Sequence, residues 1–240
     1  MIPLKDDVPS TSFPAVTVAV IGLNCLVFIS QMLFGAEGGR RIVSTFGIIP
    51  YELSHFTDLP PYTPIPLPFT LITSMFLHGG LAHLVGNMLY LWIFGDNVED
   101  SMGHVRFAVF YLLCGLAAAF TQIIVAPSST IPMIGASGAI SGVLGAYLLL
   151  YPRAKVLTLI FLGFFIETVR IPASLLLSLW IIIQVLSGAS SLVAHSLSGG
   201  VAWFAHIGGF LMGILLISSF KKPHKGLRIR KWADKNEIRW

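Results

Sequence analysis

Charged side chains are scarce in this chain of 240 residues, where Asp, Glu, Lys and Arg together make up only 11%. An ordinary soluble domain has about a quarter, and so few charges could not cover a soluble surface of this size. The shortage excludes a typical cytosolic enzyme and a disordered chain. Hydrophobic residues make up 55%. At about 20 residues per span, the length fits one membrane bundle of about six or seven helices.

Cysteine is also scarce, and the first residues lack the basic start of a signal peptide. The two cysteines, Cys25 and Cys114, sit in apolar runs, which excludes a disulfide-stapled secreted domain and predicts packing residues. The first 12 residues are polar and include Asp6 and Asp7. Since they do not resemble a signal peptide, we expect the first apolar run to remain as a membrane span.

Six apolar stretches predict an all-α, polytopic membrane bundle with six transmembrane helices. They are residues 13–34, 80–95, 105–126, 134–151, 172–187 and 199–220. Residues 71–77 read as a piece that dips into the interface before the second span. The run 156–166 is too short to cross about 30 Å and predicts an interfacial or re-entrant segment; if it crossed, the count would be seven. The expected divisions are 1–12, 13–220 and a basic tail, 221–240.

The distribution of positive charge predicts the topology. With six spans, every Lys and Arg except Arg40 and Arg41 falls on one side, so both termini are expected in the cytoplasm. The basic tail after the last span indicates contact with anionic lipid headgroups rather than nucleic acid. The compact size, without a transit-like leader, favours a prokaryotic plasma (inner) membrane.

Polar residues inside a membrane are expensive and are functional by default. Three such clusters fall in the second, fourth and sixth spans, which run in the same direction. At 1.5 Å per residue their polar groups lie roughly 5–10 Å below the outer helix ends, open to water from the outer side. The clusters are His78 with His83 and Asn87; Gly135-Ala136-Ser137-Gly138; and Ala205-His206-Ile207-Gly208-Gly209.

Ser137 and His206 are the candidate nucleophile and base. A lone membrane serine usually bonds to its own helix or packs as a small residue. Here, however, small residues at every fourth position of spans four and six predict a close helix approach, which would bring the two side chains together. Neither span contains Asp or Glu to orient the imidazole, so the prediction is a Ser–His dyad rather than a triad.

The second-span cluster supplies candidate donors for an oxyanion. Side-chain N–H groups of His83 and Asn87, with the Ser137 backbone N–H near a helix N-terminus, could stabilise that charge. His78 is expected to orient the loop above the site or line its rim, with auxiliary catalysis as the alternative. His78 and His83 are five apart without an intervening Glu, unlike a zinc protease motif. We expect no metal and no cofactor.

Together these clusters resemble the rhomboid intramembrane serine proteases over about residues 13–220. G-x-S-G alone is weak, but H-x4-H-x3-N before it and A-H-x-x-G after it make the pattern specific. The resemblance implies a six-helix core in which Ser137 is the nucleophile, His206 the base, and His83 and Asn87 the oxyanion side chains. It implies structural support from Gly135, Gly138, Gly209 and the Gly95/Glu99 pair. Family members cleave single-span or polytopic membrane proteins within or beside a transmembrane segment.

One departure from the family and three rival functions stay open at this point. Where some members have a tyrosine stacked on the base, this chain has Ser141, so His206 must be held otherwise, and packing alone would serve. The rivals are an inactive relative that binds membrane clients, a small transporter or channel, and a serine hydrolase acting on lipid esters. The sequence predicts neither the individual substrate nor the oligomeric state.

Overall fold

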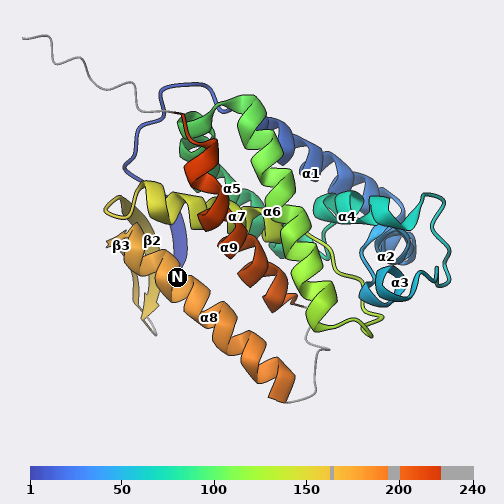
Figure 1. Cartoon of the computed structure of the whole chain (residues 1–240). Helices are drawn as coiled ribbons and strands as arrows, with labels where there is room; N and C mark the ends of the chain where they lie inside the picture. The colour runs from blue at the N-terminus through green and yellow to red at the C-terminus, as the bar shows by residue number, and fades with distance from the viewer. Residues whose placement is uncertain (163–164, 194–200, 223–240) are drawn as a thin grey trace, which may run out of the picture.

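A computed structural model describes residues 1–162, 165–193 and 201–222, and it is a mostly helical bundle (Figure 1). The long helices are α1 (Ala15–Leu33), α5 (Leu81–Met102), α6 (His104–Val125), α7 (Ser137–Leu150), α8 (Ala173–Val193) and α9 (Trp203–Phe220). The short ones are α2 (Gly35–Phe46), α3 (Pro50–His55), η1 (Leu67–Phe69), α4 (Thr70–Thr73) and η2 (Ser74–Phe76). The predicted tail lies outside the described residues from position 223 onward.

Helix α7 lies at the centre and packs against α5, α6, α8 and α9. All its residues from Gly138 to Tyr147 are buried. Small residues make this possible: a Cβ added at Gly209 would overlap the Gly138 carbonyl, and one added at Gly213 would overlap the Gly142 carbonyl. Helices α7 and α9 therefore touch backbone to backbone, the kind of close approach that glycine permits in membrane bundles.

Helix length and apolar character do not by themselves confirm the predicted six membrane spans. Among the described residues, α1, α6, α8 and α9 are long and apolar enough to cross, and α5 with the preceding short helices makes a fifth candidate bent by 82°. Helix α5 carries Asp96, Glu99 and Asp100 near its end, which lowers its apolar character. Helix α7 has 14 residues, about 21 Å at 1.5 Å per residue. It is shorter than the hydrocarbon core, so length does not confirm it as a span.

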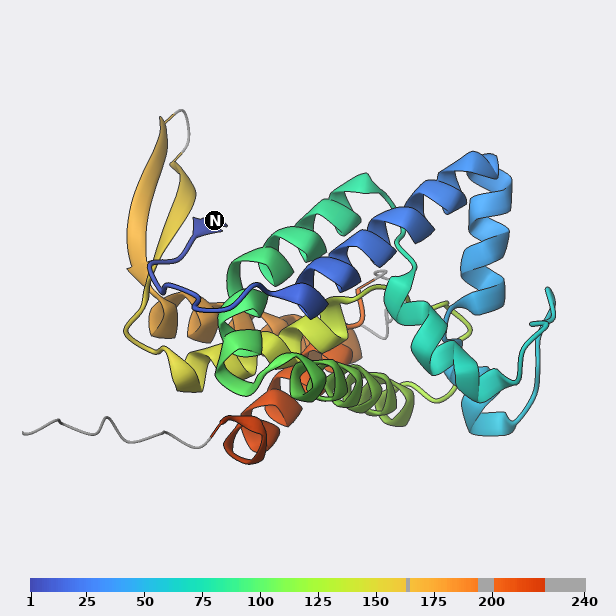
Figure 2. The ribbon, with the colours of Figure 1, turned by 90° about the horizontal axis from the view of Figure 1, so that it is seen from above.

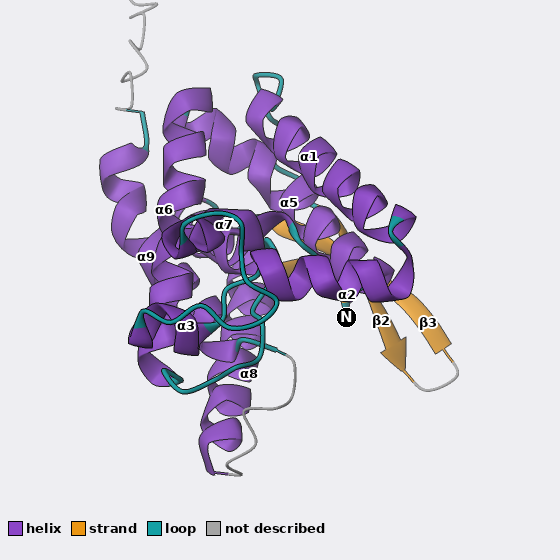
Figure 3. Ribbon diagram, turned by 90° about the vertical axis from the view of Figure 1, so that its right-hand side faces the viewer, coloured by secondary structure: helices purple, strands orange, loops and turns teal. Residues whose placement is uncertain are grey.

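Residues 35–70, which follow the first predicted span, contain the helices α2 and α3. Figure 1 shows both beside α4, at the end of the bundle away from the strands, and Figure 3 views the molecule from that end, with α2 and α3 in front. The expected dipping piece at 71–77 falls on α4 and η2, before the sharp bend into α5. These short elements cover the same end of the bundle at which α5, α7 and α9 begin.

A small three-stranded sheet accompanies the mostly helical bundle, and the run 156–166, predicted as interfacial or re-entrant, falls on two of its strands wherever it is described. Strands β2 (Lys155–Leu162) and β3 (Phe165–Pro172) pair antiparallel, with Thr158 opposite Val169, and β1 (Ile2–Lys5) adds to the other edge of β2. Figure 2 shows this sheet projecting from the side of the bundle. Val156 and Thr158 are fully buried while their neighbour Lys155 is exposed, an alternation typical of a strand.

The residues after β1 fasten the beginning of the chain to the bundle. The Tyr147 hydroxyl of α7 donates to Asp6, the Lys155 backbone N–H donates to Asp7 at 2.7 Å, and Thr11 donates to Asp100 of α5. The segment predicted as a polar N-terminal extension, residues 1–12, is therefore built into the fold.

Glu99 joins the beginning of α1 to the end of α5. Its buried carboxylate accepts hydrogen bonds from the backbone N–H groups of Val16 at 2.9 Å and Thr17 at 2.8 Å. These are first-turn donors that a helix cannot satisfy by itself. The Thr17 hydroxyl donates as well, at 2.7 Å. Gly95, one turn earlier, leaves the room for Thr17, since a Cβ there would lie 3.1 Å from its hydroxyl oxygen.

Candidate active site

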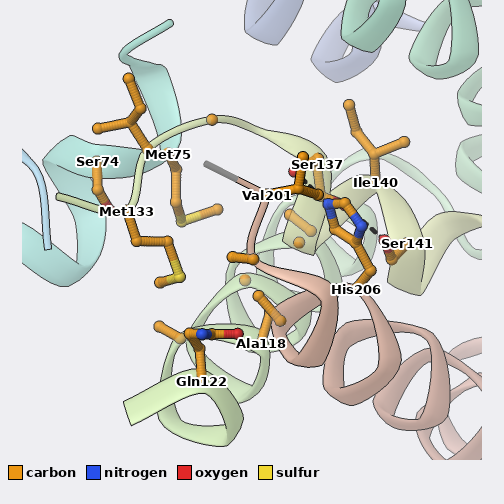
Figure 4. Close-up of a pocket in the computed structure, with 18 of the residues that line it drawn as sticks. Ser74, Met75, Ala118, Gln122, Met133, Ser137, Ile140, Ser141, Val201 and His206 are labelled. Carbon is orange, nitrogen blue, oxygen red and sulfur yellow. Dashed lines mark hydrogen bonds between the residues drawn. The ribbon is translucent and has the colours of Figure 1, made fainter. Parts of the chain in front are cut away.

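Ser137 and His206 meet where α7 and α9 begin. Ser137 is the first residue of α7, and His206 lies in the first turn of α9. The Oγ of Ser137 is 2.9 Å from Nε2 of His206, and this bond is drawn in Figure 4. The contact of Gly138 with Gly209 lies next to this pair along both helices, so the close helix approach and the serine–histidine contact are one feature.

The other ring nitrogen of His206 has a partner that the sequence interpretation missed. Nδ1 lies 2.8 Å from Oε1 of Gln184 on α8, and Gln184 is only 6% exposed. The His206 ring also lies between Trp180 and Trp203, with ring centroids at 5.8 and 6.4 Å. Packing alone therefore does not hold the ring. Gln184 carries the only carboxamide in the predicted fifth span, and polarity within a span is the signal that could have identified it.

His83 and Asn87 lie beside the backbone that leads into Ser137. Gly135 has φ +118°, a conformation that favours glycine. A Cβ there would lie 2.8 Å from His83 Nε2 and 3.7 Å from Asn87 Nδ2. The peptide chain thus passes directly against both side chains two residues before Ser137. The predicted cluster of α5 is brought together with those of α7 and α9.

His78 lies deeper than the predicted rim position, with only 2% of its surface exposed. Its Nε2 is 3.1 Å from Nδ2 of Asn87, and its backbone N–H donates to Oε1 of Gln31 on α1 at 3.1 Å. His78 and His83 pack edge to face with ring centroids 5.0 Å apart. His78 therefore contacts the oxyanion candidate Asn87.

A cavity of about 630 Å³ opens onto Ser137 and His206. Its lining includes the polar side chains of His83, Asn87 and Gln122 among a larger number of apolar ones, such as Met75. Figure 4 shows the ring of His206 next to Ser137, with Met75 and Met133 across the cavity and Gln122 below. A mostly apolar hollow with a few convergent polar groups is typical of a ligand or active site.

Among the described residues no three His, Cys, Asp or Glu side chains are grouped so that they could hold a metal ion. Glu99, Gly95 and the acidic end of α5 lie at the far end of that helix from His83. The polar groups that line the cavity include the Ser137 hydroxyl, the imidazoles of His83 and His206, and the Asn87 amide.

The fold and the site define the class: a polytopic helical membrane protein with a serine–histidine pair at a cavity inside its bundle. A model of the "Rhomboid domain" matches residues 68–222, and the chain belongs to the rhomboid family. The match covers α5 to α9 with all three polar clusters, and it begins at the short helices before α5.

Curated relatives extend well beyond this chain. "RHOMBOID-like protein 4" of Arabidopsis thaliana is 32% identical over 157 residues, which is 65% of this chain and 35% of the relative. "Rhomboid protease GluP" of Bacillus subtilis (strain 168) is 33% identical over 56% of this chain and 24% of its own length. "Rhomboid-like protein 11, chloroplastic" of Arabidopsis thaliana is 30% identical over 70% and 58%. The chain thus spans less than two thirds of each of these relatives.

Proposed function

We propose that this protein is an intramembrane serine endopeptidase that cuts membrane-protein substrates within or beside their transmembrane segments. The observation that carries the proposal is the 2.9 Å contact between Ser137 Oγ and His206 Nε2 at the cavity. A hydroxyl paired with an imidazole is the minimum arrangement for an activated serine. Membership of a family that includes a protein named a rhomboid protease supports it further.

The reaction follows from the positions of the side chains. His206 Nε2 takes the Ser137 proton as Oγ attacks the scissile carbonyl. The oxyanion rests on donors from His83 and Asn87 and on the Ser137 N–H, which has no acceptor within its own helix because it begins α7. His206 then protonates the leaving amine, and water hydrolyses the acyl-enzyme. A substrate helix must unwind locally, so small or helix-breaking residues near the cut are expected.

The location and partners of this activity are part of the proposal. In the six-span topology nearly all Lys and Arg residues fall on one side of the membrane. This distribution supports cytoplasmic termini and a cavity open to the outer side of a prokaryotic plasma membrane. The backbone N–H of Lys222 donates to the Ser101 carbonyl at 2.9 Å, so the end of α9 lies beside the end of α5. The partners are membrane-protein substrates and the surrounding bilayer.

The test uses purified protein in lipid vesicles with a transmembrane substrate that carries a fluorescence-quenched pair. Ser137→Ala and His206→Ala should each reduce cleavage by about 10⁴-fold or more, because either loss removes the activated nucleophile. Ser190→Ala and His55→Ala are matched controls. The Ser190 hydroxyl bonds within its own helix, and His55 is exposed on α3. Both should cleave at the wild-type rate.

Three outcomes would contradict the proposal. Cleavage that persists in both Ser137→Ala and His206→Ala would mean that other residues, or a contaminating protease, carry the activity. Absence of cleavage by wild type, with no fluorophosphonate labelling of Ser137, would favour an inactive client-binding relative. Hydrolysis of lipid esters without cleavage of the peptide would indicate a different serine hydrolase.

A further inference from the structure

We infer that Gln184 is a positioning residue that fixes the protonation pattern of the His206 ring and so turns its Nε2 lone pair toward Ser137. This inference rests on the proposed function, because it assigns the part that α8 plays at the same site. Gln184 does not line the cavity. It acts through His206, to which it is bonded at 2.8 Å.

The orientation of the Gln184 amide follows from its two neighbours. Its Nε2 lies 3.3 Å from the carbonyl oxygen of Trp180, one turn earlier in α8. A carbonyl can only accept a hydrogen bond, so the amide nitrogen must occupy that side. The amide oxygen then faces His206. The backbone of α8 thus sets which end of the amide the imidazole meets.

The orientation of the amide determines which ring nitrogen of His206 carries the proton. An amide oxygen can only accept, so Nδ1 of His206 must be the N–H that donates to it. In a neutral imidazole the other nitrogen, Nε2, then has its lone pair free to accept. That nitrogen lies 2.9 Å from Ser137 Oγ. The chain of bonds from the Trp180 carbonyl to the serine therefore has one consistent direction.

A neutral amide suits this buried position better than a carboxylate would. Gln184 is 6% exposed, and burial of an unpaired carboxylate in an apolar site is costly. Its oxygen still stabilises the imidazolium that forms when Ser137 gives up its proton, by accepting a stronger bond from the charged ring. Helix α8 thereby supplies, without an acid, the orientation that a buried aspartate gives in a triad.

Ser141, at the position of a stacking tyrosine in some relatives, does not compete for the ring. Its hydroxyl donates to the Ser137 carbonyl at 2.6 Å, one turn earlier in α7. The Trp180 ring is tilted by 38° to the imidazole, and the Trp203 ring is nearly perpendicular to it, at 89°. Gln184 is thus the described side chain that bonds to Nδ1.

The decisive measurement is the ¹⁵N NMR spectrum of the histidine rings, with the His206 signals assigned by comparison with His206→Ala. Wild type should show Nδ1 protonated and Nε2 bare. Gln184→Met, of similar size but without a hydrogen-bonding amide, should show mixed or reversed protonation of the two nitrogens. This readout does not need activity, so it separates failure of this inference from failure of the protease proposal. A Gln184→Met spectrum identical to that of wild type would overturn the inference.

Kinetics supply the second arm. Gln184→Met should lower kcat for peptide cleavage by roughly ten- to a hundredfold with little change in KM, less than the about 10⁴-fold loss when a triad aspartate is replaced. Gln184→Glu should restore much of the rate and move the acidic limb of the pH profile to higher pH, because a carboxylate facing Nδ1 favours the protonated ring. Among the described residues, the titratable neighbour whose charge acts on His206 is His83 of α5.

The matched control is Ile182→Ala, two residues earlier on α8. Ile182 is 52% exposed at the outer surface of the bundle, so this change should leave kcat, the pH profile and the spectrum as in wild type. If Gln184→Met and Gln184→Glu lost activity equally with an unmoved pH profile, Gln184 would be a packing residue only.

Discussion

At the residue scale, Asn87 makes a sharp prediction about the oxyanion. One N–H of its amide points to His78 Nε2, 3.1 Å away, and the second remains for a ligand in the cavity, which Asn87 lines. Asn87→Ala should reduce kcat for peptide cleavage by about 10²- to 10³-fold, the cost of one oxyanion donor, with a smaller effect on KM. The comparison is steady-state cleavage in vesicles.

Asn24→Ala is the matched control, because Asn24 is a buried asparagine of α1 whose amide donates to the Val20 carbonyl of its own helix. It should keep the wild-type kcat. If both variants lost activity to the same degree, the loss would reflect disruption of the bundle rather than of the oxyanion donors.

Ser137, His206, His83 and Asn87 could be proposed from the sequence because each carries a local signal. Ser137 follows a glycine that the turn into α7 requires, and His83 and Asn87 are four apart on one helix face. Gln184 was missed for a physical reason. A single carboxamide in an apolar span shows that something polar is bonded there, but the rotation of α8, which decides the partner, depends on packing between helices distant in sequence.

At the scale of elements, the contact between α7 and α9 should control stability. A Cβ at Gly213 would overlap the Gly142 carbonyl, and neither backbone can yield without separating the helices. Gly213→Ala should therefore cost about 1–3 kcal/mol, lower the thermal unfolding midpoint by several degrees in detergent, and reduce cleavage as His206 moves from Ser137.

Gly22→Ala is the corresponding control within α1, since nothing lies within 4 Å of the added Cβ. It should leave the midpoint unchanged or raise it slightly, because alanine favours a helix more than glycine does. A midpoint that fell equally in both variants would mean that glycine itself, rather than the crossing of α7 and α9, sets the stability.

The sheet shows where sequence reasoning about elements reached its limit. The run 156–166 is apolar and too short to cross, and a short apolar run does not distinguish a strand from a buried helical piece. Strand β2 pairs with β3, which follows it directly, and also with β1, which lies more than a hundred residues earlier. A strand that far away leaves no trace in the local pattern, whereas the long helices were predictable because their apolar length is a local property.

At the scale of the whole molecule, the first residues of the chain connect the sheet to the central helix. Asp6 accepts a hydrogen bond from the Tyr147 hydroxyl of α7, and Asp7 accepts one from the Lys155 backbone N–H of β2. The central helix therefore carries Ser137 at one end and is anchored by the N-terminal segment at the other. Both ends of α7 are fixed, which restricts the movement of the candidate nucleophile.

This anchor makes stability depend on pH. Burial raises the pKa of Asp6 above its ordinary 3.8; the Tyr147 bond opposes this, while the charges of Asp96 and Asp7 add to the rise in pKa. Since the raised pKa belongs to the folded state, this contribution to stability is fully present below about pH 3.8 and is lost as the pH rises through the raised value. At neutral pH the folded protein therefore carries the cost of an ionised, partly buried Asp6.

Asp6→Asn should remove this cost, because asparagine cannot ionise and its side-chain oxygen can still accept from Tyr147. The expected result is a variant whose thermal midpoint exceeds that of wild type near neutral pH, with the gap closing toward about pH 4. The measurement is the unfolding midpoint in detergent across that range, with Asp58→Asn, in the loop after α3, as the control. A gap that stayed constant with pH would show that the variant acts through packing, and a variant less stable than wild type at neutral pH would mean that the charged form of Asp6 is the one that anchors α7.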